Sequence, residues 1–258
     1  MRSPAHQGAQ VKPGAAFLVV VLAFGAGALL TVIDTGLGPR VGVFVFVLAG
    51  WTLSLIFHEF AHAYMAWRGG DSSIPSKGYL TLDPRRYADP VTSIGLPILI
   101  VILGGIGLPG GAVWINTSAL RSKTVASLVS LAGPVTNLGL AALFLLPVSA
   151  GVVNQTDHFH LTAALTFLGF LQVVAFVLNI MPIPGLDGYG AIEPFLPDEI
   201  RQLLAPVRRW AFLIVVGLYF YVPPVGDAFW DLILFVMGAT GVDLDLVRDG
   251  FNLFRFWR

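Results

Sequence analysis

The 258-residue sequence contains no cysteine, which excludes disulfide bonds and every metal site built from thiolates. Histidine, aspartate and glutamate therefore remain as the strong metal ligands that the chain can offer. Charged residues are also scarce: they make up 12% of the sequence, and 15 basic and 15 acidic side chains give a net charge of +0. No excess of positive charge is present that would indicate nucleic-acid binding.

Apolar residues are abundant instead, at 56% of the chain, and the mean hydropathy is +0.79. These values exceed those of soluble domains and predict an α-helical polytopic membrane protein that has the lipid bilayer as its partner. The first apolar run can span a bilayer and lacks a small-residue cleavage site, so we expect a retained helix rather than a signal peptide. The runs cover residues 15–33, 41–67, 91–108, 125–147, 161–181, 207–222 and 229–242.

The positions of Lys and Arg predict how these runs cross the membrane. If residues 91–108 crossed once, the loops that hold Arg121, Lys123 and Arg201 would be external, against the usual cytoplasmic excess of basic residues. If that segment enters and leaves on the same side, these loops become cytoplasmic. A proline and a glycine pair suit such a hairpin, provided that its backbone is buried against protein. We therefore expect about six transmembrane helices plus one re-entrant hairpin, with both termini cytoplasmic.

One short motif, His58-Glu59-Phe60-Ala61-His62, lies in the second apolar run. On a helix the two histidines are four residues apart, so both imidazoles project from one face within reach of a single zinc ion. Glu59 follows the first histidine, where its carboxylate can act as general base toward a water activated by the metal. Ionisable groups at membrane depth are costly and seldom idle, which favours a metal site over hydrogen-bonded core histidines.

Two histidines leave a catalytic zinc ion short of one protein ligand, because such sites usually have three. The best candidate is Asp187, which follows an apolar run and then Pro182 and Pro184. The prolines cannot continue a regular helix, so the backbone should open here, as is tolerated where it lines a cavity. The alternative is an Asp-Gly turn in the cytoplasm, and this stretch alone favours neither.

A polar side chain, Asn137, lies inside another apolar run. An amide in that position can donate a hydrogen bond to a developing oxyanion, or it can simply join two helices. From the residue alone, helix packing is the better interpretation.

Three blocks of the chain resemble the signature blocks of the site-2 protease family of intramembrane zinc metalloproteases. They are His58 to His62, Ala132-Gly133-Pro134 with Asn137, and Asn179 to Pro182 with Leu186-Asp187-Gly188. The stretch Leu82-Asp83-Pro84-Arg85-Arg86 also resembles a compact bacterial branch without PDZ or CBS modules. The resemblance implies that Zn²⁺ is bound by His58, His62 and Asp187. It further implies that Glu59 activates water and that Asn137 positions or polarises the scissile carbonyl.

The resemblance also implies a single membrane-embedded protease domain, with a catalytic core over about 41–188 and C-terminal helices over 205–258. Its substrate would be a transmembrane protein, cleaved within or near a transmembrane helix in regulated intramembrane proteolysis in a bacterial cell membrane. Short β-strands at 78–82 and 112–116 are expected near the active site, where an unwound substrate could pair with them. The alternatives are a non-proteolytic zinc-binding membrane scaffold and a metal transporter.

Two further features carry weaker expectations. The last apolar and basic residues, 244–258, alternate at helical spacing, which fits an interfacial amphipathic helix and an ordinary packed tail about equally. His158 and His160 could form a separate metal site, although a solvated loop is the better interpretation.

Overall fold

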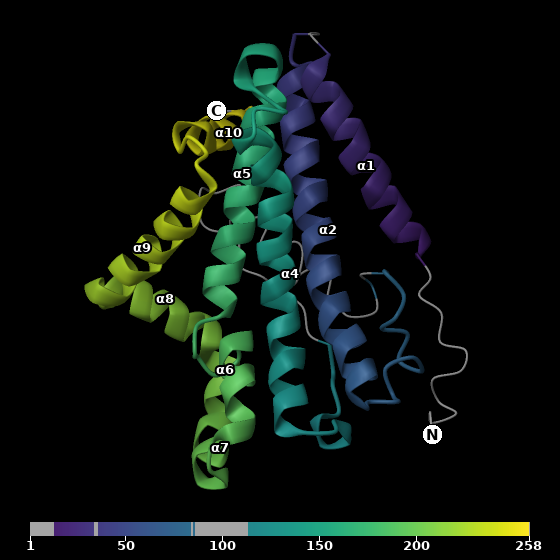
Figure 1. The fold of residues 1–258 in the computed structure, drawn as a ribbon, viewed down its shortest axis with the longest axis vertical. Coiled ribbons are helices and arrows are strands. Elements are labelled where there is room, and N and C mark those ends of the chain that lie inside the picture. Colours follow the sequence, from purple (N-terminus) through teal and green to yellow (C-terminus); the bar gives the residue numbers. More distant parts are fainter. Residues whose placement is uncertain (1–12, 34–35, 84, 86–112, 258) are drawn as a thin grey trace.

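A computed structural model of the chain describes residues 13–33, 36–83, 85 and 113–257, and Figure 1 shows its helices. Four of them are long and apolar enough to cross a membrane, and up to six spans are counted if each of two bent helix pairs is one span. The four apolar runs that begin at residues 15, 41, 125 and 161 are thus confirmed as helices. The long helices are α1 (Ala15–Val32), α2 (Gly38–Gly69), α4 (Lys123–Ser149) and α5 (Gln155–Asn179).

Further helices and 3-10 turns follow in the described chain. A 3-10 turn, η4 (Thr117–Ala119), precedes α4. After α5 come α6 (Asp187–Ile192), η5 (Glu193–Phe195), α7 (Asp198–Leu204), η6 (Ala205–Trp210), α8 (Ala211–Tyr221), α9 (Pro223–Thr240) and α10 (Asp245–Phe254). The predicted re-entrant hairpin at 91–108 lies outside the described residues.

The core is formed where α2, α4 and α5 meet. α2 and α5 contribute the fully buried Val43, Leu168 and Val173, and α4 adds Leu145. α1 packs only on the outside of this bundle: Leu22 and Val19 are 72% and 64% exposed. Large apolar side chains that face outward along a hydrophobic helix are expected where lipid surrounds the protein.

The predicted short β-strands are not found among the described residues. Residues 78–80 lie in a series of tight turns, in which the Tyr79 N–H donates to the Ile74 carbonyl, and Thr81 is an isolated bridge residue rather than part of a strand. Residues 113–116 have no regular secondary structure, and two of their backbone groups bond to side chains of the described residues. The Trp114 carbonyl accepts a hydrogen bond from Lys77 Nζ at 2.7 Å, and the Asn116 N–H donates one to the Asp71 carboxylate at 2.8 Å. The described residues therefore give no support to the predicted strands.

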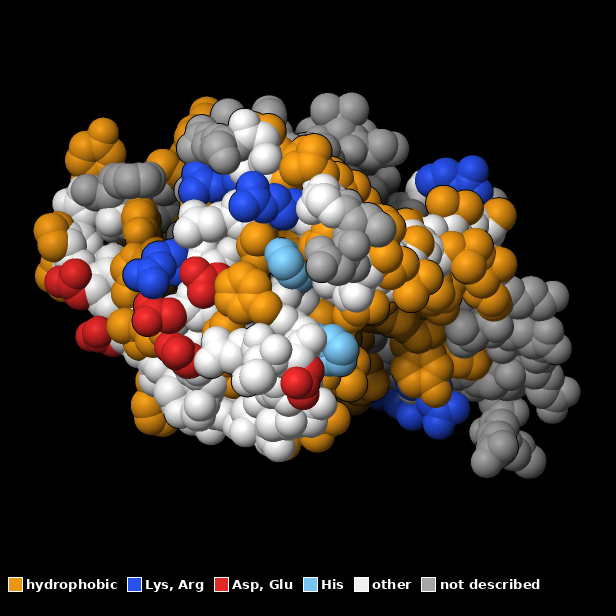
Figure 2. Space-filling view, turned by 90° about the horizontal axis from the view of Figure 1, so that it is seen from above, with side chains coloured by type: hydrophobic (Ala, Val, Ile, Leu, Met, Phe, Trp, Pro, Cys, Tyr) orange, Lys and Arg blue, Asp and Glu red, His pale blue; other side chains and the backbone are white. Residues whose placement is uncertain are grey.

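The C-terminal helix α10 packs against the N-terminal parts of α2 and α5. Phe254 is 1% exposed, and its ring packs at a tilt against that of Phe44, with centroids 5.2 Å apart. Gly250 lies against the Ala163 carbonyl. The packed alternative therefore holds for this helix. Figure 2 looks onto this end of the molecule and shows acidic, basic and histidine side chains among apolar ones.

The C-terminal helix lies at one end of the bundle, whereas the described chain begins about halfway along it (Figure 1). Near its start, Phe17 contacts Phe57, with ring centroids 6.0 Å apart, whereas α10 lies beside Phe44. Phe44 and Phe57 are about 20 Å apart along α2, at about 1.5 Å per residue.

Candidate metal centre and active site

Helix α2 carries the three residues of the predicted motif into the interior of the bundle. His58, Glu59 and His62 are 5%, 5% and 7% exposed. Because the histidines are four residues apart, their rings lie on one face of the helix, and their Nε2 atoms are 3.0 Å apart. The spacing seen in the sequence therefore produces two adjacent imidazole nitrogens in a buried place.

The other nitrogen of each ring is held by α4. His58 Nδ1 donates to Asn137 Oδ1 at 2.5 Å, and His62 Nδ1 donates to the Val129 carbonyl at 2.7 Å. Both acceptors require the ring hydrogen on Nδ1, so both Nε2 atoms present lone pairs to each other. Two lone pairs at this separation repel, and a cation that both nitrogens ligate removes that repulsion.

Asp187 supplies the third ligand group from a break in the chain. α5 ends at Asn179, and the segment with Pro182 and Pro184 turns through Gly185 at φ +107° before α6 begins at Asp187. This is the helix break that the two prolines predict, because proline removes a backbone donor and clashes in a helix interior. Asp187 is thereby brought back toward the motif on α2.

The Asp187 carboxylate lies beside both histidines. Its Oδ2 atom is 3.2 Å from His58 Nε2 and 3.4 Å from His62 Nε2. That oxygen is buried and accepts no hydrogen bond within the described part of the chain.

These three atoms fit a zinc ion. Bonds of about 2.0 to 2.2 Å in tetrahedral geometry separate neighbouring ligand atoms by about 3.3 Å. The separations among His58, His62 and Asp187 are close to that value, and the two nitrogens and the carboxylate oxygen are ligand types that zinc prefers. α4 also leaves space here: a Cβ on Gly133 would lie 2.5 Å from His58 Nε2 and closer still to His62 Nε2.

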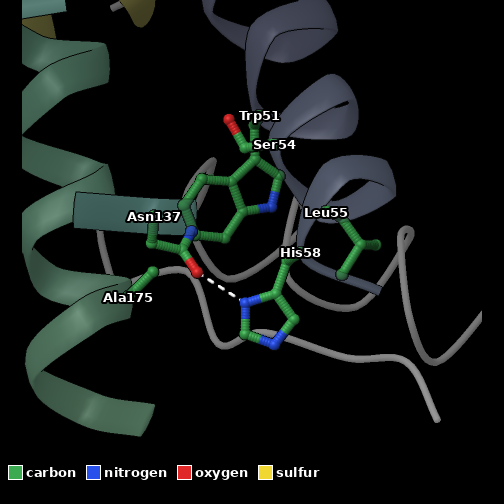
Figure 3. A pocket seen from close by; sticks show the side chains of 6 residues that line it. All are labelled: Trp51, Ser54, Leu55, His58, Asn137 and Ala175. Carbon is green, nitrogen blue, oxygen red and sulfur yellow. Dashed lines mark hydrogen bonds between the residues drawn. The ribbon is translucent and has the colours of Figure 1, made fainter. Parts of the chain in front are cut away.

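Glu59 follows His58 on α2. Its carboxylate lies within electrostatic range of the three candidate ligands and also contacts the Val113 backbone. A small cavity of about 10 Å³ adjoins His58, which is room for about one water molecule. Figure 3 shows the His58–Asn137 hydrogen bond at its edge. Side chains from α2, α4 and α5 line it: Trp51, Ser54, Leu55, His58, Asn137 and Ala175.

Asn137 contacts the site through His58. Its Oδ1 atom accepts from that histidine, and its Nδ2 atom donates to Gln172 Oε1 on α5 at 2.8 Å. Three features of the site were not predicted from the sequence: Gln172, the Val129 carbonyl and the close approach of Gly133. Gln172 could have been found from the sequence, because it is a lone amide inside an apolar run. The role of a backbone carbonyl has no signal in the sequence.

The remaining candidate histidines lie elsewhere. His158 and His160 are in the first turns of α5, at the end of the molecule far from the motif. Of the groups that the structure describes, His58, His62 and Asp187 are the one cluster of three or more ligands.

Comparison with known proteins supports the same chemistry. The chain is 47% identical over 254 residues to Rip2 of Mycolicibacterium smegmatis, a protein named as a candidate zinc metalloprotease, which covers 96% of this chain and 95% of that protein. Rip2 of Mycobacterium tuberculosis H37Rv is 47% identical over 216 residues, with 84% and 82% covered. YwhC of Bacillus subtilis, named in the same way, is 32% identical over 181 residues, with 68% and 79% covered.

No family model and no solved structure matches the chain. The relatives nevertheless extend over most of its length, and their name agrees with a zinc-competent cluster inside apolar helices. The chain belongs to the site-2 protease family of intramembrane zinc metalloproteases.

Proposed function

We propose that His58, His62 and Asp187 hold the zinc ion of this protease and that Glu59 activates the hydrolytic water. The substrate is a membrane-tethered protein, cleaved within or near a transmembrane helix in regulated intramembrane proteolysis. The observation that carries this assignment is the convergence of two Nε2 atoms and one buried carboxylate oxygen within 4.8 Å of one another.

When bound, zinc lowers the pKa of a water molecule and polarises a carbonyl oxygen. Glu59 is the adjacent base: its carboxylate takes the proton of that water and passes it to the leaving amine. The burial of Glu59, at 5% exposure, keeps this transfer away from bulk solvent. A substrate helix hides its peptide bonds in internal hydrogen bonds, so it has to unwind locally before attack.

The contacts of Asn137 favour a role that was not predicted, the positioning of His58, over a contact with the scissile carbonyl. The Oδ1 atom holds His58, and the amide nitrogen, which a scissile carbonyl would need as a donor, already gives one hydrogen to Gln172. Asn137 therefore fixes the ring hydrogen of His58 on Nδ1 and leaves Nε2 for the metal.

We further propose that the end of the bundle nearest the metal cluster faces the cytoplasm. His58 and His62 lie about 16 Å and about 10 Å from the C-terminal end of α2, at about 1.5 Å per residue. Water therefore has to reach only a shallow depth. The basic loops at this end fit the usual cytoplasmic excess of positive charge, and they contain Arg68, Lys77, Arg121, Lys123, Arg201, Arg208 and Arg209.

In this orientation the N-terminus is cytoplasmic, as predicted. α10 lies at the opposite end of the bundle, so the side proposed for the C-terminal helix is the external one, which differs from the prediction. Tagging the two termini with a reporter active on one side of the membrane tests this: equal reporter activity at both ends would contradict it.

The alternative functions are less well supported. A transporter needs ligands that step across the membrane, whereas the candidate ligands in the described residues gather at one level. A non-catalytic scaffold does not require a glutamate beside its metal ligands, yet Glu59 is present and buried there.

The metal assignment is tested by zinc content in detergent-purified protein. Wild type should hold about one zinc ion per chain, and His58→Ala and Asp187→Ala should lose most of it. His158→Ala is the matched control, because that histidine lies outside the cluster and should leave the zinc content unchanged. Equal zinc in all four proteins would refute the assignment.

The role of Glu59 needs a cleavage assay with a single-span membrane substrate. Glu59→Gln should retain zinc and lose about 10²- to 10⁴-fold in cleavage rate, because the amide cannot accept the proton. A Glu59→Gln protein that cleaves at the wild-type rate would rule out Glu59 as the base.

A further inference from the structure

Gln172 lies in the middle of α5 and is 0% exposed. It is the one amide side chain within the apolar stretch of that helix before Asn179. Its Oε1 atom accepts a hydrogen bond from Asn137 Nδ2 at 2.8 Å, and its own Nε2 atom has no partner within the described part of the chain. A buried amide whose NH₂ group is unpaired is costly, so ordinary helix packing is a poor explanation for a glutamine at this position.

The direction of its one hydrogen bond suggests what Gln172 does. An amide can be turned by half a rotation, and the two ends of Asn137 are nearly identical in shape. If Asn137 turned, its NH₂ group would face His58, and the ring hydrogen of His58 would then move from Nδ1 to Nε2. A hydrogen on Nε2 blocks the position that the metal needs.

We propose that Gln172 is a positioning residue of the zinc site, which acts through Asn137. Its Oε1 atom holds the NH₂ group of Asn137 toward α5, so that Asn137 Oδ1 faces His58 and the His58 ring hydrogen stays on Nδ1. The inference rests on the proposed role of His58 as a zinc ligand. A chain of two hydrogen bonds, at 2.8 Å and 2.5 Å, connects α5 to the metal ligand on α2.

The test compares three substitutions in the full chain, purified in detergent. Gln172→Met keeps the length of the side chain and removes the acceptor. Gln172→Glu keeps an acceptor oxygen in the same place and removes the unpartnered Nε2 atom. The matched control is Thr166→Val, which changes another fully buried polar side chain of α5 whose hydroxyl bonds only to its own helix.

Zinc affinity is measured by competition with a chelator, and the ligand geometry by the visible absorption of bound Co²⁺. Gln172→Met should bind zinc about 10-fold more weakly with altered Co²⁺ bands, the lower end of the effect of residues that support metal ligands. Gln172→Glu and Thr166→Val should stay within about twofold of wild type, with unchanged bands, because both leave Asn137 held.

Two further variants extend the test, and the first of them keeps the inference testable if Gln172→Met does not fold. Gln172→Asn withdraws the amide by one methylene and should weaken zinc binding in the same way. Asn137→Asp combined with Gln172→Met should recover affinity, because a carboxylate accepts from His58 whichever way it is turned.

The possible outcomes separate the two proposals. Wild-type affinity in folded Gln172→Met or Gln172→Asn protein overturns the inference, and so does an equal loss in Gln172→Glu. Failure of wild type itself to bind zinc would instead overturn the proposed metal site.

Discussion

Gly133→Ala should damage the metal site more than any other single methyl group added to α4. Gly133 faces α2 at the level of the two histidines. A Cβ at this position would lie 2.5 Å from His58 Nε2 and Cε1 and closer to His62 Nε2. Carbon and nitrogen atoms that are not bonded normally approach to about 3.5 Å, so the overlap is about 1 Å with each ring.

The histidines cannot easily move aside, because hydrogen bonds to Asn137 and Val129 hold both rings from behind. Added volume in a packed site costs about 1 to 3 kcal/mol, and this site should lie at the upper end. About 3 kcal/mol corresponds to about a 100-fold loss of zinc affinity. Zinc affinity by chelator competition and the cleavage rate of a membrane substrate are the measurements.

The matched control is Gly139→Ala, which adds the same methyl group to the same helix with nothing within 4 Å. Both substitutions gain about 1 kcal/mol of helix propensity, so that term cancels in the comparison. If Gly133→Ala and Gly139→Ala bind zinc equally well, the close approach of α4 to the ligands does not matter and the geometric argument fails.

Three other perturbations follow from the same structure. Asp71→Ala should destabilise the fold by about 1.5 to 3 kcal/mol in thermal or denaturant unfolding, because the carboxylate accepts from Ser73 and from the Asn116 backbone. Burial raises the Asp71 pKa, but these hydrogen bonds lower it more, to below its ordinary 3.8. The stabilisation is therefore full above pH 3.8 and is lost as the pH falls through the lowered pKa, where mutant and wild type should converge. Gly250→Ala would press α10 against α5 and should cost about 1 to 3 kcal/mol, whereas Gly238→Ala, with open space around it, should not. Chelation of zinc should lower the unfolding temperature of wild type, since a ligand at 100 times its Kd contributes about 2.7 kcal/mol; an unchanged value would contradict metal binding to the folded state.

The part of the site on α2 was predictable because its geometry is local. Residues four apart on a helix lie on one face wherever the helix goes, so the His58 and His62 pair needs no knowledge of the fold. Asp187 was half predictable: the prolines before it force an end to α5, but the direction in which the chain then turns depends on packing. The strand predicted at 112–116 finds no support among the described residues, where two backbone groups of this segment bond to the side chains of Lys77 and Asp71. Such partners are distant in the sequence and cannot be predicted from a short run of residues.

The placement of the C-terminal part shows a different limit. Hydropathy identified two apolar runs after residue 205 and counted each as a full crossing. α8, however, has 11 residues and is about 16 Å long, which is about half of a bilayer core. It counts as a candidate span only together with the preceding segment, residues 198–210, against which it is bent by 83°. A count of apolar runs does not reveal this, although Pro223 and Pro224 mark the break between α8 and α9 in the sequence.

Helix α4 links the local and the distant parts of the site. Val129, Gly133 and Asn137 are spaced by four residues, so they lie on one face, opposite two histidines that have the same spacing on α2. The two helices run antiparallel, and the Val129 carbonyl therefore meets His62 while Asn137 meets His58. Gly133 lies between these contacts and lets the backbone of α4 come close enough for both. One face of α4 thus fixes the ring hydrogens of both histidines on Nδ1 and leaves room for the metal. α4 therefore determines the geometry of the site although it supplies no ligand.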